Sequence, residues 1–319
     1  MMEHIYILSC EKDGGIYHYL FENGEFQFVD KTPLDRPMYA IIREDKIHVI
    51  LREVDEVTHF GGILSFDIDL NGMLINPTKI ESTMGVVPCH LEVKNNDKYV
   101  VNYLSGNIVK IGEKVVAHNG KGVHPVRQEA AHTHFVCISP DEKYILCTDL
   151  GVDKVFVYTK QLEKVSEVKI TDGYGPRHII FSKDGNFAFV ACELSSTVEV
   201  LRYANGKFEY INSINCLPKD FNGQSTVAAI RRKGNYIYVS NRGHDSIAIF
   251  KFENDALNLV EIVSCGGKSP RDINIIGDYI FSTNELSNNV TIFKIENDGT
   301  LKKICNEILS PNPVCIVSN

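Results

Sequence analysis

Guanidinium, imidazole and carboxylate side chains recur at comparable places along this chain. They stand beside apolar segments, at Cys89-His90, His132-Thr133-His134, Arg177-His178, Glu193, Arg242-Gly243-His244, Arg271-Asp272 and Glu285. Arginine binds carboxylates and phosphates through charge-assisted hydrogen bonds, and a neutral imidazole suits a general base near neutral pH. These residue types together predict a site for a small anionic ligand, with acid–base chemistry available.

Some of these residues also have a purely structural explanation. Ion pairs between neighbouring strands would account for two sets, Arg177 with Glu193 and Arg271 with Glu285. Exposed pairs of that kind contribute only ~0.2–1 kcal/mol. His132 and His134 are two positions apart, so on a strand both would point to one face. We expect one of them to lie in the site and the other to hold a loop carbonyl.

Other catalytic motifs are incomplete. Gly266-Gly267-Lys268-Ser269 resembles the end of a phosphate-binding loop, but Ile262 stands where that loop needs its first glycine. The sequence has no zinc-protease, nucleophile-elbow or dinucleotide-binding motif in the required context. The cysteine spacings match no metal template. We therefore expect neither a metal nor a cofactor.

The nine cysteines include no C-x-x-C pair, and their number is odd. Reduced thiols in an intracellular protein are the simplest interpretation. Cys137 and Cys147 are the exception to examine. They flank one predicted hairpin almost symmetrically and could face each other as a pair.

Composition and charge exclude several classes of protein. The 319 residues carry a formal net charge of -8 and are 44% hydrophobic, as in a soluble globular protein. The negative charge argues against nucleic-acid binding. No apolar run approaches the ~20 residues of a membrane helix, and the first residues lack the features of a signal peptide. We expect a cytoplasmic protein, and any positive character of the site must be local.

The elements that position these residues are repeated. One pattern recurs, in which an apolar strand, a short polar turn and a second apolar strand are followed by further strand sequence. Its turns centre near Asp45, Asp97, Asp141, Asp184, Gly234 and Asp278. This spacing is the length of a four-stranded propeller blade. No convincing amphipathic helix of 10 residues or more is present.

A seventh copy is split between the two ends of the chain. Residues 313–318 begin the pattern, and residues 4–9, 15–20 and 25–29 supply its remaining strands. The sequence therefore predicts an all-β, seven-bladed β-propeller of a single domain, 1–319, whose ring is closed by N- and C-terminal strands sharing one blade. Closure removes the open sheet edges that promote association, so we expect a monomer.

The hairpins place the chemistry at one end of the ring. The first two strands of each copy are antiparallel, so residues before the first strand and after the second lie at the same end. That end combines His132 and His134 with Asp149, Arg177 with Glu193, and Arg271 with Glu285. The opposite end carries ordinary turn residues such as Lys183-Asp184-Gly185-Asn186. A central mouth on the first of these ends is the predicted site.

These motifs resemble a known family. The resemblance spans essentially the whole chain and is carried by Pro88-Cys89-His90-Leu91, His132-Thr133-His134, Gly175-Pro176-Arg177-His178, Cys192-Glu193-Leu194, Pro270-Arg271-Asp272 and the stretch 240–250. It is the family of seven-bladed lactonases, whose members include bacterial 6-phosphogluconolactonases of the cycloisomerase-2 type. Fungal carboxy-cis,cis-muconate cyclase is a relative.

The resemblance implies a site at the central mouth. It implies catalytic roles for His132 or His134, Arg177, Glu193 and Arg242. We add His90, His178, His244, Arg271 and Glu285 as candidates for substrate binding. The chain departs from the family at Cys192, where asparagine is usual, and at Ala229, where a glutamate is usual. Arg52-Glu53 also replaces a usual Asn-Glu. These differences concern substrate and catalysis rather than fold.

The implied activity is hydrolysis of 6-phospho-D-glucono-1,5-lactone, a step of the pentose phosphate pathway. Water would attack the lactone carbonyl, with histidine or Glu193 as base and an arginine stabilising the oxyanion. Two alternatives stay open: a lactonising cyclase or another hydrolase of anionic lactones, and a non-catalytic propeller that binds a partner. Exposed aromatic side chains at the mouth would favour the binding platform. This mouth instead offers arginine, histidine and glutamate, with Tyr103 and Tyr174 as the evident aromatics.

Overall fold

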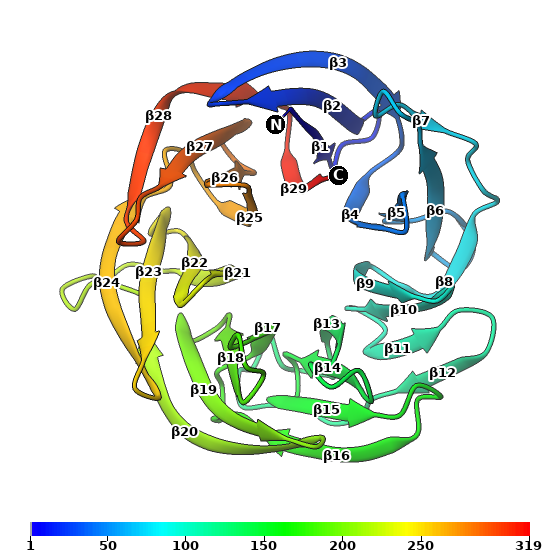
Figure 1. The fold of residues 1–319 in the computed structure, drawn as a ribbon. Coiled ribbons are helices and arrows are strands. Elements are labelled where there is room, and N and C mark those ends of the chain that lie inside the picture. Colours follow the sequence, from blue (N-terminus) through cyan, green and yellow to red (C-terminus); the bar gives the residue numbers. More distant parts are fainter. Residues whose placement is uncertain (1) are drawn as a thin grey trace.

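Seven antiparallel sheets surround a central axis (Figure 1). The computed structural model describes residues 2–319, apart from the side chains of Cys305 and Asn306. All of its regular elements in that range are strands, which confirms the predicted seven-bladed β-propeller. No helix in the described part of the chain has the length and apolar character that a membrane crossing needs.

Each blade is one sheet, and in blades 3 to 7 the strands follow the chain outward from the axis. Blade 1 comprises β29 (Pro313–Ser318), β1 (Glu3–Ser9), β2 (Gly15–Glu22) and β3 (Glu25–Pro33). Blade 2 comprises β4 (Pro37–Arg43), β5 (Lys46–Leu51), β6 (Phe60–Ile68), β7 (Leu74–Ile75) and β8 (Glu81–Val86). Blade 3 comprises β9 (Pro88–Lys94), β10 (Asp97–Asn102), β11 (Asn107–Lys110) and β12 (Lys114–Ala117). Blades 4 and 5 comprise β13 (Thr133–Ile138), β14 (Ile145–Asp149), β15 (Lys154–Tyr158) and β16 (Lys164–Lys169); and β17 (Pro176–Phe181), β18 (Phe187–Cys192), β19 (Thr197–Ala204) and β20 (Lys207–Asn215). Blades 6 and 7 comprise β21 (Thr226–Lys233), β22 (Tyr236–Arg242), β23 (Ser246–Glu253) and β24 (Ala256–Ser264); and β25 (Pro270–Ile276), β26 (Tyr279–Asn284), β27 (Asn289–Ile295) and β28 (Leu301–Leu309).

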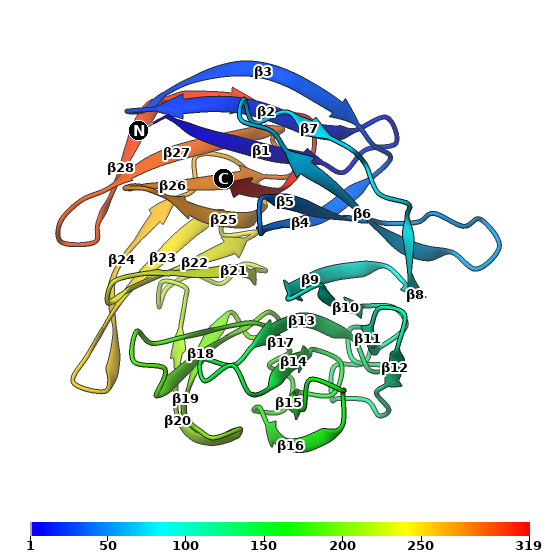
Figure 2. The ribbon, with the colours of Figure 1, turned by 45° about the vertical axis from the view of Figure 1, so that its right-hand side comes forward.

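The two ends of the chain close the ring, as predicted. The innermost strand of blade 1 is the C-terminal β29, which pairs with the N-terminal β1 through contacts such as Ile7 with Ile316. Figure 2 shows these two strands side by side in the same sheet. Closure of the ring gives backbone hydrogen-bond partners to strands that would otherwise be the open edges of the first and last repeats.

The hydrophobic core lies between neighbouring blades. Between blades 5 and 6, for example, Val198 and Val200 pack in one cluster with Val227 and Val239. The strand β18 is buried along its whole length, because other strands flank it and a blade covers each face. Outer strands such as β20 contain only half-buried and exposed residues. The apolar, β-branched inner strands therefore form the rigid frame that holds the central residues.

Cys137 and Cys147 do not pair, so the expectation of reduced thiols holds for them and the exception does not. Val136 is opposite Cys147, and Cys137 is opposite Leu146. Successive side chains point to opposite faces of a sheet, so the two cysteines lie on different faces. They belong to different core clusters, and both thiols are free. The other cysteines with described side chains are also free, while the side chain of Cys305 lies outside the described residues.

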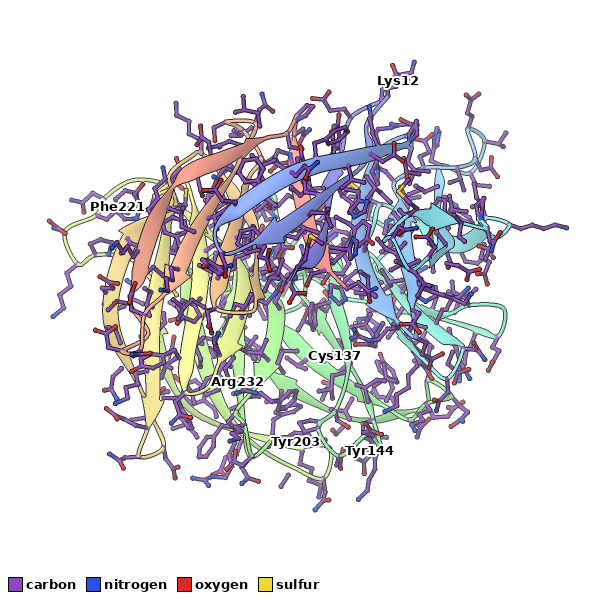
Figure 3. All side chains as sticks on the ribbon, turned by 45° about the horizontal axis from the view of Figure 1, so that its top comes forward. Lys12, Cys137, Tyr144, Tyr203, Phe221 and Arg232 are labelled. Carbon is purple, nitrogen blue, oxygen red and sulfur yellow. The ribbon has the colours of Figure 1, made fainter. Side chains whose placement is uncertain are left out.

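The ring has two distinct ends. At the hairpin end lie the turns between the first and second strands of each blade, such as residues 182–186. At the loop end, each blade is connected to the next, and the inner strands begin there. Figure 3 shows this separation: Tyr144, Tyr203 and Arg232 lie toward the hairpin end, and Lys12 and Phe221 belong to segments at the loop end.

Candidate active site

Every inner strand has a β-bulge close to the loop end. The bulges lie at Met38, Cys89, His134, Arg177, Ala228–Ala229, Arg271 and Val314. A bulge leaves its residue unpaired and redirects the side chain. All of the single-residue bulges contribute to the wall of one narrow central cavity of about 20 Å³.

This ring of bulged residues is polar on one side. Cys89, His134 and Arg177 come from the consecutive blades 3, 4 and 5, whereas Met38 and Val314 come from blades 2 and 1. Arg271 of blade 7 also faces the cavity. A ligand in the mouth would therefore meet imidazole and guanidinium groups on one side and apolar side chains on the other.

Glu193 forms ion pairs with three arginines on the polar side of the cavity. It follows β18, and its backbone N–H donates to the carbonyl of Gly175 at 2.7 Å. One carboxylate oxygen lies 2.5 Å from the guanidinium of Arg127, and the other lies 3.0 Å from Arg177 and 3.0 Å from Arg242. The carboxylate is almost fully buried, so three guanidinium groups take the place of its solvent.

The charges of this cluster shift its pKa values in a defined direction. Burial alone would raise the pKa of Glu193, but Arg242, Arg177 and the other nearby positive groups hold it well below its ordinary value. Burial, together with the positive charge of Arg242, lowers the pKa of Arg177, and Glu193 opposes that shift. Glu193 is therefore a stable carboxylate and a weak base, and its role in this geometry is to hold the arginines in place.

His134 differs from Glu193 in both charge and contacts. Burial and the nearby Arg177 lower the pKa of His134 well below its usual value, so the imidazole is neutral. Its Nδ1 atom is buried without a hydrogen-bond partner among the described residues. Its ring lies edge-on to Tyr103 and to His178, with centroids 5.8 Å and 5.6 Å away. The neutral imidazole lines the cavity and can take a proton from a water held there, but its lowered pKa makes it a weaker base than an ordinary histidine.

His132 holds the loop, as expected for one of the two histidines. Its Nδ1 donates to the carbonyl of Tyr103 at 2.9 Å, and its Nε2 lies 3.2 Å from the carboxylate of Glu129. Its ring stacks on that of Tyr103, with a centroid distance of 4.4 Å. The argument from strand alternation does not hold here, because β13 begins after His132 and bulges at His134.

The predicted substrate-binding residues are not all brought together. Arg271 reaches the central cavity and pairs with Glu285 at 3.3 Å. His178 also lines the cavity, and its Nε2 accepts a hydrogen bond from Arg177 at 2.9 Å. These contacts place Arg271, Glu285 and His178 beside the cluster around Glu193.

His90 and His244 do not line the central cavity, although the ring of His90 lies edge-on to His178 with a centroid distance of 5.9 Å. The ring of His90 packs between Tyr39 and Phe135 and lines a second cavity, of about 310 Å³, at the hairpin end of the axis. His244 bonds Ser246 at 2.7 Å and packs against Phe221, which Figure 3 places at the outer margin of the ring. The contact of these two histidines with a ligand in the mouth therefore stays a prediction.

Two charged groups near the axis were not predicted from the sequence. Arg127 belongs to the long connection between β12 and β13 and reaches across to Glu193 of blade 5. Arg231 pairs with Asp272 at 2.8 Å, and both side chains are largely buried. Two consecutive arginines on an innermost strand, Arg231 and Arg232, were the available signal for the second pair. No local pattern pointed to Arg127.

The arginines of the mouth outnumber the carboxylates that pair with them, although the chain as a whole is acidic. Arg127, Arg177 and Arg242 share the one carboxylate of Glu193, while Arg271 is matched by Glu285. Among these four arginines and two glutamates, the excess is two positive charges. The described residues form no group of three or more His, Cys, Asp or Glu side chains that could hold a metal ion. This arrangement is suited to an anionic ligand.

Comparisons with known proteins agree with this architecture. The family described as "Lactonase, 7-bladed beta-propeller" matches residues 4–318. An uncharacterized protein of Staphylococcus epidermidis is 36% identical in an alignment of 300 residues that covers 85% of this chain and 85% of its own. A crystal structure from Lactobacillus plantarum has a TM-score of 0.90 at 27% identity and covers 100% of both chains. Another, from Bacteroides fragilis and described as a candidate 6-phosphogluconolactonase, has a TM-score of 0.89 at 27% identity and covers 99% of this chain and 98% of its own. The chain belongs to the family of seven-bladed β-propeller lactonases.

Proposed function

We propose that this protein hydrolyses an anionic sugar lactone, with 6-phospho-D-glucono-1,5-lactone as the substrate. The observation that carries the proposal is the excess of arginines around Glu193 beside a neutral His134. The family membership and the description of the Bacteroides fragilis relative support the same reaction class. The product, 6-phosphogluconate, is an intermediate of the pentose phosphate pathway, and we expect the protein to act there in the cytoplasm.

His134 is the proposed general base. The central cavity, of about 20 Å³, is large enough for a water molecule and too small for a sugar, so the substrate would lie above it in the mouth. Water would donate a proton to His134 as its oxygen attacks the lactone carbonyl carbon. The proton would then pass to the ring oxygen as the bond between that oxygen and the carbonyl carbon breaks. The products of this sequence are one open-chain acid and the neutral histidine.

Arg177 is the proposed oxyanion donor. Its guanidinium is fixed by Glu193, by His178 and by the carbonyl of Ala228 at 2.7 Å, so it needs no reorganisation during the reaction. A preorganised donor of this kind is worth ~2.7–4 kcal/mol in the transition state. Glu193 then acts as a positioning residue, because both of its oxygens are already occupied by arginines.

The deciding experiment compares the wild type with Arg177→Ala on freshly prepared 6-phosphogluconolactone, with spontaneous opening subtracted. We expect a loss of about 10²–10³-fold in kcat. Arg202→Ala is the matched control, because Arg202 is half-exposed on β19, far from the mouth. Circular dichroism would establish that the buried substitution still folds. Wild-type activity at the spontaneous rate would refute this substrate, and carboxymuconolactones would be tested next.

A further inference from the structure

A groove runs outward from the mouth between blades 6 and 7. It has a volume of about 410 Å³, and its walls include Thr226, Arg242, Lys268, Ser269 and Leu286. The central cavity holds about 20 Å³, so it cannot receive a sugar phosphate. The groove has the size of an ordinary small-molecule pocket. The bulk of a substrate whose carbonyl lies over the cavity would therefore extend into this groove.

The groove is continuous with the proposed catalytic cluster. Arg242 forms part of its wall and also lies 3.0 Å from Glu193. On the other side, the hydroxyl of Ser269 donates to Glu285 at 3.4 Å, and Glu285 pairs with Arg271 at the central cavity. One ligand can thus contact Arg177 at one end and the groove at the other.

Two cationic groups in the groove have unused hydrogen-bonding capacity. The ammonium of exposed Lys268 has no ion-pair or hydrogen-bond partner within the described part of the chain. In Arg242, Nη2 lies 3.0 Å from Glu193 and donates to the carbonyl of Val227 at 3.3 Å, while Nη1 has no hydrogen-bond partner among the described residues. The connection before β25 places Lys268 firmly, because its backbone N–H bonds Ser287 at 2.7 Å and its carbonyl accepts from Leu286 at 3.1 Å.

The wall contains one carboxylate, Asp245, against the two cations Arg242 and Lys268, so the charge of the wall is +1. Asp245 Oδ1 accepts the backbone N–H groups of Gly243 at 3.1 Å and Ser269 at 2.8 Å, so it fixes the two loops that form the groove. Lys268 and Arg242 face the remaining space. An anion in the groove would gain charge-assisted hydrogen bonds from both.

We propose that this groove binds the phosphate group of the substrate and that Lys268 determines the preference for phosphorylated over neutral lactones. The inference rests on the proposed function, because it assigns one end of the same substrate. Arg177 and His134 act on the lactone carbonyl, and Lys268 with Arg242 holds the remote phosphate.

The test is Lys268→Ala, assayed on 6-phosphogluconolactone and on unphosphorylated glucono-1,5-lactone with spontaneous opening subtracted. We expect KM for the phosphorylated lactone to rise about tenfold, because one charge-assisted contact is lost. The ratio of the two kcat/KM values should fall by the same factor. Added salt should weaken the wild-type preference, since the contact is near the surface. Lys183→Ala is the control, since Lys183 is an exposed lysine at the hairpin end.

A binding measurement separates this inference from the proposed function. Calorimetric titration with the stable acids 6-phosphogluconate and gluconate needs no turnover. Tighter binding of the phosphorylated acid by the wild type, lost in Lys268→Ala and kept in Lys183→Ala, supports the phosphate subsite even if neither lactone is hydrolysed. Equal affinities in the wild type, or an unchanged preference in Lys268→Ala, would overturn it, whether or not the protein is a lactonase.

Discussion

Replacement of His134 by glutamine tests the assignment of the general base. Glutamine keeps a polar side chain of similar length but cannot accept a proton at neutral pH. A positioned base contributes ~10²–10⁴-fold, so we expect kcat to fall by that factor, which corresponds to ~2.7–5.4 kcal/mol in the activation free energy. His134 Nδ1 has no hydrogen-bond partner within residues 2–319, so the substitution breaks no hydrogen bond at that atom. The free energy of unfolding should change by only ~1 kcal/mol.

The assay follows hydrolysis of 6-phosphogluconolactone at several pH values, with spontaneous opening subtracted. Burial and Arg177 lower the pKa of His134, so its neutral form persists as the pH falls below the usual histidine range. The wild-type kcat/KM should consequently show no acid limb near pH ~6.5. His59→Gln is the matched control, because His59 is an exposed histidine on the β5–β6 loop.

Two results would refute this reasoning. A folded His134→Gln protein with kcat within about threefold of the wild type would show that His134 is not the base. If Glu193→Gln stayed folded and lost activity while His134→Gln kept it, the carboxylate would be the base. That outcome would also show that the three guanidinium groups do not suppress the basicity of Glu193.

Two further predictions concern stability. Glu193→Gln removes the one carboxylate shared by Arg127, Arg177 and Arg242. We therefore expect the free energy of unfolding, measured in urea, to fall by ~3–5 kcal/mol. A fall of less than ~1 kcal/mol would show that solvent reaches the cluster. Burial lowers the folded-state pKa values of His90, His134 and His178, so below pH ~6.5 the unfolded chain binds protons that the folded chain does not. The free energy of unfolding should therefore decrease as the pH falls from ~6.5 toward ~5, by up to ~1.4 kcal/mol per pH unit for each histidine. Denaturation curves that do not change over this pH range would contradict the prediction that the three buried imidazoles stay neutral.

The sequence determined the blade pattern and the position of each blade in the ring. Apolar strands separated by short polar turns are local signals, and each repeat carries them within about one blade length. The split of the seventh blade followed from the same pattern, since residues 313–318 lack a second strand and residues 4–9 lack a first. The antiparallel hairpin then placed Arg177 and Glu193 at one end of the molecule without further information.

Only the tertiary structure decided which side chains face the axis. A bulge in each inner strand turns His134 and Arg177 into the cavity, and a one-residue change of register reverses the direction of a side chain. Arg127 joins Glu193 from a connection 66 residues earlier in the chain, and Lys268 and Arg242 line the same groove between two blades. The periodicity of the sequence describes each strand by itself, whereas these contacts join segments that are distant in the chain. The types of the site residues can therefore be predicted from the sequence, but their positions relative to one another depend on how the blades pack around the axis.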